Sequence, residues 1–130
     1  MTNTLRPQDI KLHRRSRELE LCYADGSSYR LSCEFLRVHS PSAEVRGHGE
    51  GQEVLQTGKQ KVNITGIKAV GHYAIQLIFD DGHDTGLYAW DYLYKLATQR
   101  DSYWNKYLER LKAEGGSRDP DVQVVRFDPS

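Results

Sequence analysis

The first third of the chain alternates between apolar and polar positions. The alternation covers residues 9–13 and 18–23, and it resumes at residues 28–32 after an Asp-Gly pair at Asp25 and Gly26. A repeat of two places every second side chain on one face, which predicts strands with one face on a core. The Asp-Gly pair is typical of a tight hairpin turn. The positions expected to face inward are Ile10, Leu12, Leu19, Leu21, Tyr23, Tyr29 and Leu31. We therefore predict a three-stranded antiparallel meander.

The pattern changes at residues 33–39 (CEFLRVH), where the apolar positions have the spacing of a short helix packed on that sheet. Residues 40–61 then lose all periodicity and contain Gly47, Gly49 and Gly51. We predict a long surface loop over this segment. A loop of that length in a compact domain is often functional.

A second group of strands follows the loop. Residues 62–73 and 74–79 are rich in apolar residues, and the second run alternates. An Asp-Asp-Gly turn at residues 80–82 leads to a short returning strand at residues 85–88. The sequence thus predicts a second antiparallel group built on a hairpin.

Helical spacing begins at about residue 89 and continues to about residue 114. One face of this segment is marked by Leu93, Ala97, Trp104, Leu108 and Leu111. Asp101 and Ser102 interrupt the pattern and are suited to cap a second helical segment. Gly115 and Gly116 are the expected stop.

These elements predict an α+β fold with antiparallel strands in two hairpin-based groups, one short helix and a C-terminal helix packed across them. We predict a flexible N-terminal arm over residues 1–8, one domain over residues 9–114 and a flexible tail over residues 115–130.

Charge and composition narrow the class of partner. The chain has 130 residues, and its 18 Lys plus Arg balance 18 Asp plus Glu, so the formal net charge is zero with neutral His. Proteins whose main partner is nucleic acid or an anionic membrane are usually basic, so neither partner is expected. The chain shows no secretory signal and no apolar run of ~18 residues. Its two cysteines, Cys22 and Cys33, are too few for a disulfide framework. We expect a cytoplasmic protein.

The sequence contains no constellation that favours catalysis. Residues 47–51 (GHGEG) lack the preceding strand and the following helix, Lys and Ser/Thr that a phosphate-binding loop requires, so we interpret them as a flexible loop. No nucleophile elbow occurs. We expect the chain not to be an enzyme.

A metal site is a second possibility. No pair among the five histidines and two cysteines has the close spacing of a known metal site. Cys33, His39 and His83 would converge if the short helix and the second hairpin were neighbours. The competing interpretation is that Cys33 is a small buried apolar residue and His83 a hydrogen-bonded turn residue. Structural zinc normally takes four ligands, so we favour the interpretation without metal.

Aromatic rings crowd residues 88–107. They are Tyr88, Trp90, Tyr92, Tyr94, Tyr103, Trp104 and Tyr107. These rings cannot all enter a core shared with Leu93 and Leu108, so some are expected on the surface, where Tyr and Trp favour protein interfaces. The competing interpretation is that the tyrosines merely cover the sheet edge. The interaction surface that we predict consists of His83, Asp84, Tyr88, Trp90, Asp91 and Tyr94.

Three stretches of the chain resemble a known family. They are LRPQDIKLHRRSRELELCYADG (5–26), CEFLRVHSPSAEV (33–45) and FDDGHDTGLYAWDYLY (79–94). Together they are similar to the small bacterial domain DUF971, which is also the N-terminal region of gamma-butyrobetaine hydroxylase. The resemblance covers about residues 5–112, and the block around Asp-Gly-His is its most specific part.

In the hydroxylase this domain binds zinc, so the resemblance implies a site with three thiolates and the histidine of the Asp-Gly-His block. At the matching cysteine positions this chain has Ser40, Ser42 and Val45, and only His83 remains. A neutral hydroxyl does not replace a thiolate as a zinc ligand. We therefore expect packing or hydrogen bonds in place of the metal.

The iron and 2-oxoglutarate chemistry of the hydroxylase belongs to a separate downstream domain and is not expected here. Similar domains are also fused to P-loop ATPases of the iron–sulfur carrier type, which implies an accessory role. We predict a small non-catalytic interaction or adaptor domain with a protein partner and no cofactor, accessory to iron–sulfur or metalloenzyme maturation. The alternative is a metal-binding (Zn or Fe) accessory protein that uses His83 with Cys33 or His39.

Overall fold

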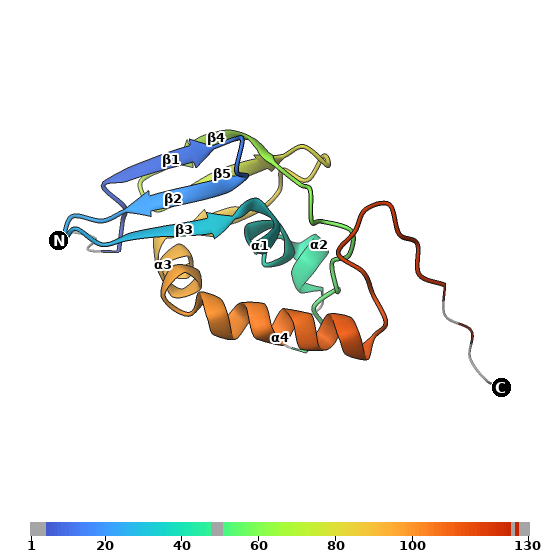
Figure 1. The fold of residues 1–130 in the computed structure, drawn as a ribbon. Coiled ribbons are helices and arrows are strands. Elements are labelled where there is room, and N and C mark those ends of the chain that lie inside the picture. Colours follow the sequence, from blue (N-terminus) through green and yellow to red (C-terminus); the bar gives the residue numbers. More distant parts are fainter. Residues whose placement is uncertain (1–4, 48–50, 126, 128–130) are drawn as a thin grey trace.

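The computed structural model describes residues 5–47, 51–125 and 127, which form two three-stranded antiparallel sheets and four helices. The sheets lie together on one side of the molecule, and the helices lie on the other (Figure 1). This arrangement confirms the predicted α+β class and the two groups of strands built on hairpins.

The first sheet has the order β1-β2-β3 and is formed by β1 (Asp9–His13), β2 (Glu18–Cys22) and β3 (Ser28–Ser32). Its register sets Leu19 opposite Leu31, and both side chains are fully buried. Gly26 turns the hairpin with φ 89°, and the carboxylate of Asp25 accepts a hydrogen bond from the Ser27 backbone N–H at 2.9 Å. The predicted meander is confirmed.

Two short helices follow, α1 (Cys33–Val38) and α2 (Ala43–Arg46). The hydroxyls of Ser32 and Ser42 cap them by accepting hydrogen bonds from backbone N–H groups of the first turn, at 3.0 and 3.3 Å. The predicted first helix is confirmed, whereas α2 lies inside the segment 40–61 that we predicted to be a long surface loop. A single turn is too short to leave a periodic signal. Of the glycine-rich stretch, residues 48–50 lie outside the described part of the chain.

The second sheet has the order β4-β5-β6 and is formed by β4 (Ile64–Val70), β5 (Ala74–Phe79) and β6 (Leu87–Ala89). β4 is shorter than the predicted 62–73, because Gly71 adopts φ 56° and starts the turn into β5. β6 starts two residues later than the predicted 85–88 and ends one residue later, at Ala89.

The last helical segment is divided into α3 (Trp90–Thr98) and α4 (Arg100–Ala113). The break falls at Gln99, whose backbone has φ −116° and ψ 25°. We predicted a break at Asp101 and Ser102, but both lie inside α4, and the Asp101 carboxylate stabilises its first turn. Gly115 ends α4 with φ 70°, as predicted. No helix in the described ranges is long and apolar enough to cross a bilayer.

The main core lies between the sheets and α1 and α3. Its fully buried members of largest volume include Leu19, Leu21, Leu31, Phe35, Leu36, Ile64, Leu77, Tyr88, Leu93 and Leu96. A smaller cluster of Val38, Tyr107 and Leu111 joins α1 to α4. The end of the first helix is therefore held against the last one.

Both terminal segments make contacts with the folded domain. Before β1, the backbone N–H of Gln8 donates to Cys22 at 2.7 Å, so the arm predicted over residues 1–8 is partly attached; residues 1–4 lie outside the described part. After α4, the carbonyls of Ser117 and Arg118 accept backbone hydrogen bonds from the 58–60 segment at 2.9 and 3.0 Å. The domain thus continues to Arg118, beyond the predicted end at residue 114.

Candidate functional site

The turn after β5 aims His83 into the protein. Gly82 adopts φ 90°, and the Phe79 backbone N–H closes the turn onto the His83 carbonyl at 3.0 Å. The Asp81 carboxylate accepts a hydrogen bond from the His83 backbone N–H at 3.1 Å. The imidazole is consequently buried, with its side chain only 2% exposed.

Both ring nitrogens of His83 have partners on one segment, with Ser40 just before α2 and Glu44 in its first turn. Nε2 lies 2.8 Å from Ser40 Oγ, and Nδ1 lies 3.2 Å from a carboxylate oxygen of Glu44. A carboxylate only accepts, so Nδ1 carries the hydrogen in this contact, and a neutral ring leaves Nε2 to accept from the Ser40 hydroxyl. The neutral imidazole therefore satisfies both contacts at once.

Further hydrogen bonds join the same two segments. Ser42 Oγ lies 2.7 Å from Thr85 Oγ1, and the Ser42 backbone N–H donates to Ser40 Oγ at 3.3 Å. Gly86 allows this close approach, because a Cβ at that position would meet Ser40 Oγ at 2.4 Å. We call His83, Ser40, Ser42, Glu44 and Thr85 the His83 cluster.

Two ion pairs beside the His83 cluster hold the turn after β5 in place. Asp81 accepts from Arg37 Nε at 2.8 Å and from Lys59 Nζ at 2.6 Å. Partial burial opposes ionisation of Asp81, but the hydrogen bonds from Lys59 and the His83 N–H and the charge of Arg37 outweigh it and lower its pKa to about 2. Asp81 is ionised at neutral pH.

Burial lowers the pKa of His83 below its ordinary value of 6.5, and the nearby Arg37 charge lowers it further. Glu44 and Asp81 act in the opposite direction without reversing the shift. The ring is accordingly neutral at neutral pH, which agrees with the tautomer that the hydrogen bonds require.

The cluster brings together three of the four positions at which the resemblance implies zinc ligands. Ser40 contacts His83 directly, Ser42 contacts Ser40, and Val45 is buried at 5% exposure in α2. One imidazole, two hydroxyls and an alkyl group do not fit the nitrogen and thiolate set that structural zinc uses. Within the described ranges, no three His, Cys, Asp or Glu side chains are grouped to hold a metal ion.

The alternative ligand set is not brought together. Cys33 lies in the core with Sγ 3.6 Å from Asn63 Oδ1, and burial raises the pKa of its thiol to about 11. His39 places Nδ1 2.8 Å from the Phe35 carbonyl and packs its ring against Tyr103 at 5.4 Å. Each of these side chains therefore has partners other than His83.

Three of the six residues in the predicted interaction surface are buried. His83, Tyr88 and Trp90 are only 5%, 0% and 6% exposed. The Tyr88 hydroxyl donates to the Leu36 carbonyl at 2.5 Å, so β6 turns this ring inward. Asp84 and Asp91 are exposed, and Tyr94 is half-buried with its ring edge on Tyr23.

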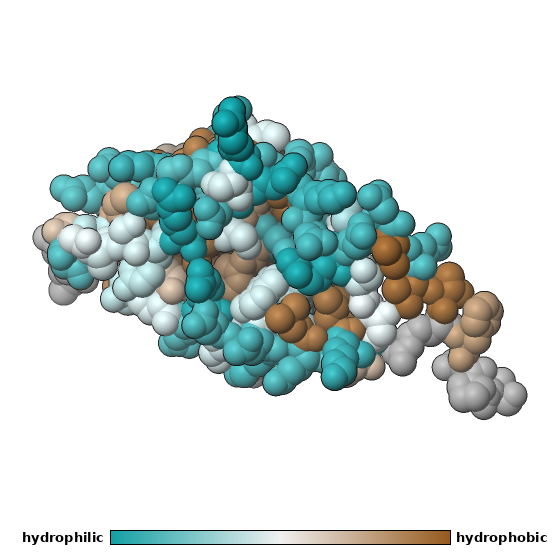
Figure 2. All heavy atoms as spheres, in the orientation of Figure 1, coloured by the Kyte–Doolittle hydropathy of each residue, from teal (hydrophilic) through white to brown (hydrophobic). Residues whose placement is uncertain are grey.

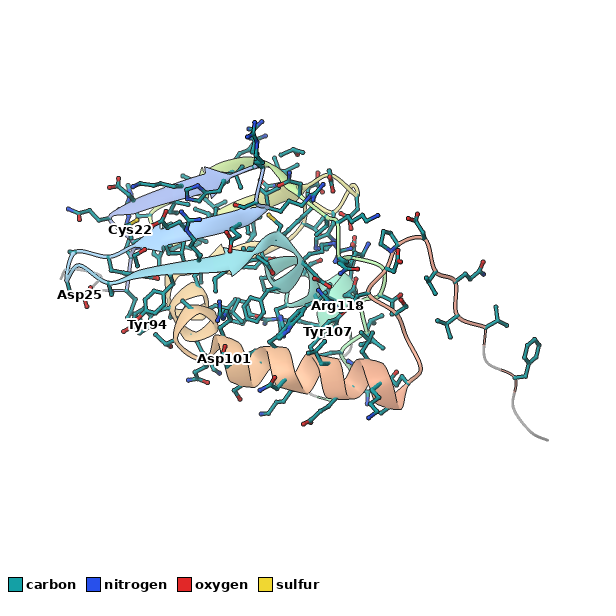
Figure 3. All side chains as sticks on the ribbon, in the orientation of Figure 1. Cys22, Asp25, Tyr94, Asp101, Tyr107 and Arg118 are labelled. Carbon is teal, nitrogen blue, oxygen red and sulfur yellow. The ribbon has the colours of Figure 1, made fainter. Side chains whose placement is uncertain are left out.

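A groove between α2 and α4 is lined by two half-buried tyrosines and one buried tyrosine. It is lined by the half-buried Tyr92 and Tyr103, by Tyr107, and by the apolar side chains of Val38, Val45, Val54 and Leu55. Its cations are Arg46, Lys95, Lys106 and Arg110. In Figure 3, Tyr107 rises from α4 toward α1 and α2. We call this feature the α2–α4 groove.

The sequence does contain a signal for this groove. Residues 103, 106, 107 and 110 follow the spacing i, i+3, i+4 and i+7, so two tyrosines and two cations share one face of α4. The surface predicted over residues 83–94 lies before this part of α4 in the chain and does not include it.

The fold and the His83 cluster together define a small α+β domain organised around a buried turn histidine. Residues 10–94 match the family described as gamma-butyrobetaine hydroxylase-like, N-terminal, and the chain belongs to this family. The resemblance found in the sequence is confirmed. No protein of curated function matches the chain.

Solved structures of similar chains agree with this assignment. Two NMR solution structures are 55% and 49% identical to the chain, with TM-scores of 0.78 and 0.77. The first covers 93% of this chain and 95% of its own, and the second 98% and 96%. A crystal structure of a DUF971 protein of unknown function from Acidithiobacillus ferrooxidans is 35% identical, with a TM-score of 0.57, over 75% of this chain and 98% of its own.

Proposed function

We propose that the chain is a non-catalytic interaction domain and that the α2–α4 groove is the surface that contacts its protein partner. The observation that carries this proposal is that the groove combines two half-buried tyrosines, Tyr92 and Tyr103, with positive charge that no ion pair of the described residues neutralises. Arg46, Lys95 and Lys106 form no ion pair within the described ranges, and Glu53 is the only carboxylate among the described residues that line the groove.

The positive charge is a local feature of a chain whose net charge is zero. One cation already contacts a ring, because the Arg46 guanidinium lies 5.4 Å from the ring centroid of Tyr92. Tyrosine and arginine are over-represented in interface centres, because they bury a large area and keep polar groups for the partner. This chemistry favours a protein segment that carries both acidic and apolar side chains.

The pathway in which the domain acts is proposed from the proteins to which similar domains are fused. Similar domains are fused to ATPases of the iron–sulfur carrier type, so the partners that we propose act in iron–sulfur or metalloenzyme maturation. The domain would act there by contact, as an adaptor, and not by chemistry of its own.

Charge reversal tests the surface. The double variant Lys95→Glu/Lys106→Glu is expected to keep the fold and to lose the proteins that the wild-type chain captures from native cytosol. A matched control, Lys11→Glu/Lys68→Glu, changes two exposed lysines on the strands β1 and β4 and is expected to retain them. Equal capture by the groove variant and the control would show that the groove is not the contact surface.

A further inference from the structure

Exposed apolar side chains concentrate near the C-terminus. Seven large hydrophobic residues of the described ranges are exposed, and four of them follow Arg118: Val122, Val124, Val125 and Phe127, at 50%, 47%, 61% and 87% exposure. Figure 2 shows brown spheres along the C-terminal segment, which extends from a largely hydrophilic body. Four large apolar side chains in six positions are more than scattered surface residues and indicate a contact segment.

This segment begins at a fixed point and then leaves the body. Ser117 and Arg118 are held by backbone hydrogen bonds to the 58–60 segment, and Arg118 forms two hydrogen bonds with Glu34 at 2.7 and 2.8 Å. Beyond this anchor the chain runs outward (Figure 1). Its apolar residues are therefore presented to other molecules from a defined position.

The segment has the chemistry that complements the α2–α4 groove. Residues 119–128 (DPDVQVVRFD) contain three aspartates and one arginine around the four apolar residues. The groove offers Arg46, Lys95, Lys106 and Arg110 around tyrosine rings and apolar side chains. Apolar side chains would enter the groove, and the aspartates would lie near its cations.

The direction of the segment favours the groove of another copy over its own. Val54 and Leu55 line the groove on one side and a shallow cleft beside Val122 and Val124 on the other. This pair of residues is therefore a wall between the segment and the groove of the same chain. To dock in the groove of its own chain, the segment would have to turn back across Val54 and Leu55 after Val124.

We propose that the C-terminal apolar segment (Val122, Val124, Val125 and Phe127) of one copy occupies the α2–α4 groove of a second copy, and that two copies exchange these segments. The exchange is reciprocal, so it closes as a symmetric dimer and does not propagate. The proposal rests on the groove being an interaction site, and it names a second copy of the chain as the occupant.

The test uses the full chain and two variants that damage opposite halves of the contact. The tail variant is Val125→Asp/Phe127→Asp, and the groove variant is Lys95→Glu/Lys106→Glu; all four positions are exposed, so both variants should fold as the wild type does. Sedimentation equilibrium across a concentration series should show the wild-type mass rising from 14.9 kDa toward twice that value. Each variant alone should associate at least tenfold more weakly.

Mixing the two variants gives the decisive result. The mixture contains one intact segment and one intact groove in different molecules, so it should associate more strongly than either variant alone. The proposal is overturned if the wild type is monomeric at all concentrations, as docking within one chain or binding of another protein would give, or if the mixture behaves like its components. A monomeric wild type whose groove variant still loses its cytosolic partners would overturn this proposal while the proposed function stands.

Discussion

The His83 cluster and the α2–α4 groove are built from the same stretch of chain but differ in how their polar groups are satisfied. In the cluster, Ser40, Ser42 and Glu44 bond to the turn after β5, and the His83 ring is almost fully buried. In the groove, Arg46 and the lysines of α3 and α4 have no carboxylate partner within the described ranges.

The difference assigns a separate role to each region. Polar groups that satisfy one another in a buried site stabilise a fold and leave little capacity for a ligand. Cations beside accessible rings keep that capacity, because a partner can still neutralise and cover them. The cluster therefore accounts for the stability of the turn, and the groove is the region to examine for binding.

The largest expected effect comes from introducing metal ligands at the positions where the resemblance implies them. The triple variant Ser40→Cys/Ser42→Cys/Val45→Cys supplies three thiolates on the segment that contacts His83, and we expect it to bind one Zn²⁺ per chain. At a thousandfold excess of free zinc over the dissociation constant, binding would add about 4 kcal/mol to the free energy of unfolding. Elemental analysis and melting with and without chelator measure both quantities.

The wild-type chain is the control for this experiment. It is expected to hold less than about a tenth of an equivalent of Zn or Fe and to melt identically with chelator, because structural metal contributes folding energy. A full equivalent of metal in the purified wild type would contradict our interpretation of the cluster.

Removing the His83 ring should lower the free energy of unfolding by almost as much as zinc binding raises it in the triple variant. His83→Ala leaves a cavity and the Ser40 hydroxyl without its partner, and we expect a loss of about 3 kcal/mol in the free energy of unfolding. Glu44→Gln is the matched control, because the Glu44 side chain is 67% exposed, and its effect should stay below about 0.5 kcal/mol. Urea unfolding measures both; a similar small loss for each would show that His83 does not support the fold.

A methyl group at Gly86 should disturb the cluster from its other side. The added Cβ would meet Ser40 Oγ at 2.4 Å, so Gly86→Ala should cost about 2 kcal/mol. Gly66→Ala is a suitable comparison, because its Cβ would meet only the flexible end of Ile78 at 3.2 Å. If the two variants unfold at the same urea concentration, the close approach at Gly86 is not a constraint on the fold.

Lowering the pH should weaken the cluster and leave the groove cations charged. The pKa of His83 is lowered on folding, so the unfolded chain binds the proton more readily. The stability that the neutral ring contributes is complete above pH 6.5 and is lost as the pH falls from there toward the lowered pKa of the folded state. The pKa of His39 is also lowered by burial and adds a loss in the same direction.

Urea unfolding at pH values from 8 to 5 tests this expectation. His83→Gln and His39→Gln should each flatten the decline in stability. An unchanged slope in the first variant would mean that His83 titrates alike in the folded and unfolded chains.

The smallest expected effect on stability belongs to the groove. Lys95→Glu/Lys106→Glu changes two exposed side chains without ion pairs in the described ranges, so the free energy of unfolding should change by less than about 0.5 kcal/mol. Thermal and urea unfolding of the variant would measure the change. A loss comparable to that of His83→Ala would erase the distinction between the two regions.

Much of the fold could be predicted because its signals are local. The alternation that buries Leu19, Leu21 and Leu31 and the Asp-Gly turn at Gly26 depend only on neighbouring residues. The break at Gln99 could not be predicted in the same way, because no glycine, proline or capping side chain marks it. Packing between α3 and the remaining structure decides such a position.

In the candidate site, too, only the features with a local sequence signal could be predicted. The histidine of the Asp-Gly-His turn was identified from sequence, and so were Ser40 and Ser42, which the structure joins to it. The direction of Tyr88 and Trp90 could not be, since it depends on where β6 crosses the core and on carbonyl groups of Leu36 and His72 that are remote in sequence. An aromatic residue after a strand can face either way, and only long-range contacts select one.

The ion pair between Arg118 and Glu34 has a practical consequence for dividing the protein into fragments. The family match ends at residue 94, yet the Glu34 side chain is only 6% exposed and its charged partner comes after α4. Arg118 also covers the Trp104 ring at 5.1 Å. A shortened chain that ends before residue 118 would leave the buried Glu34 carboxylate without its charged partner. An expression fragment should therefore include all residues through Arg118.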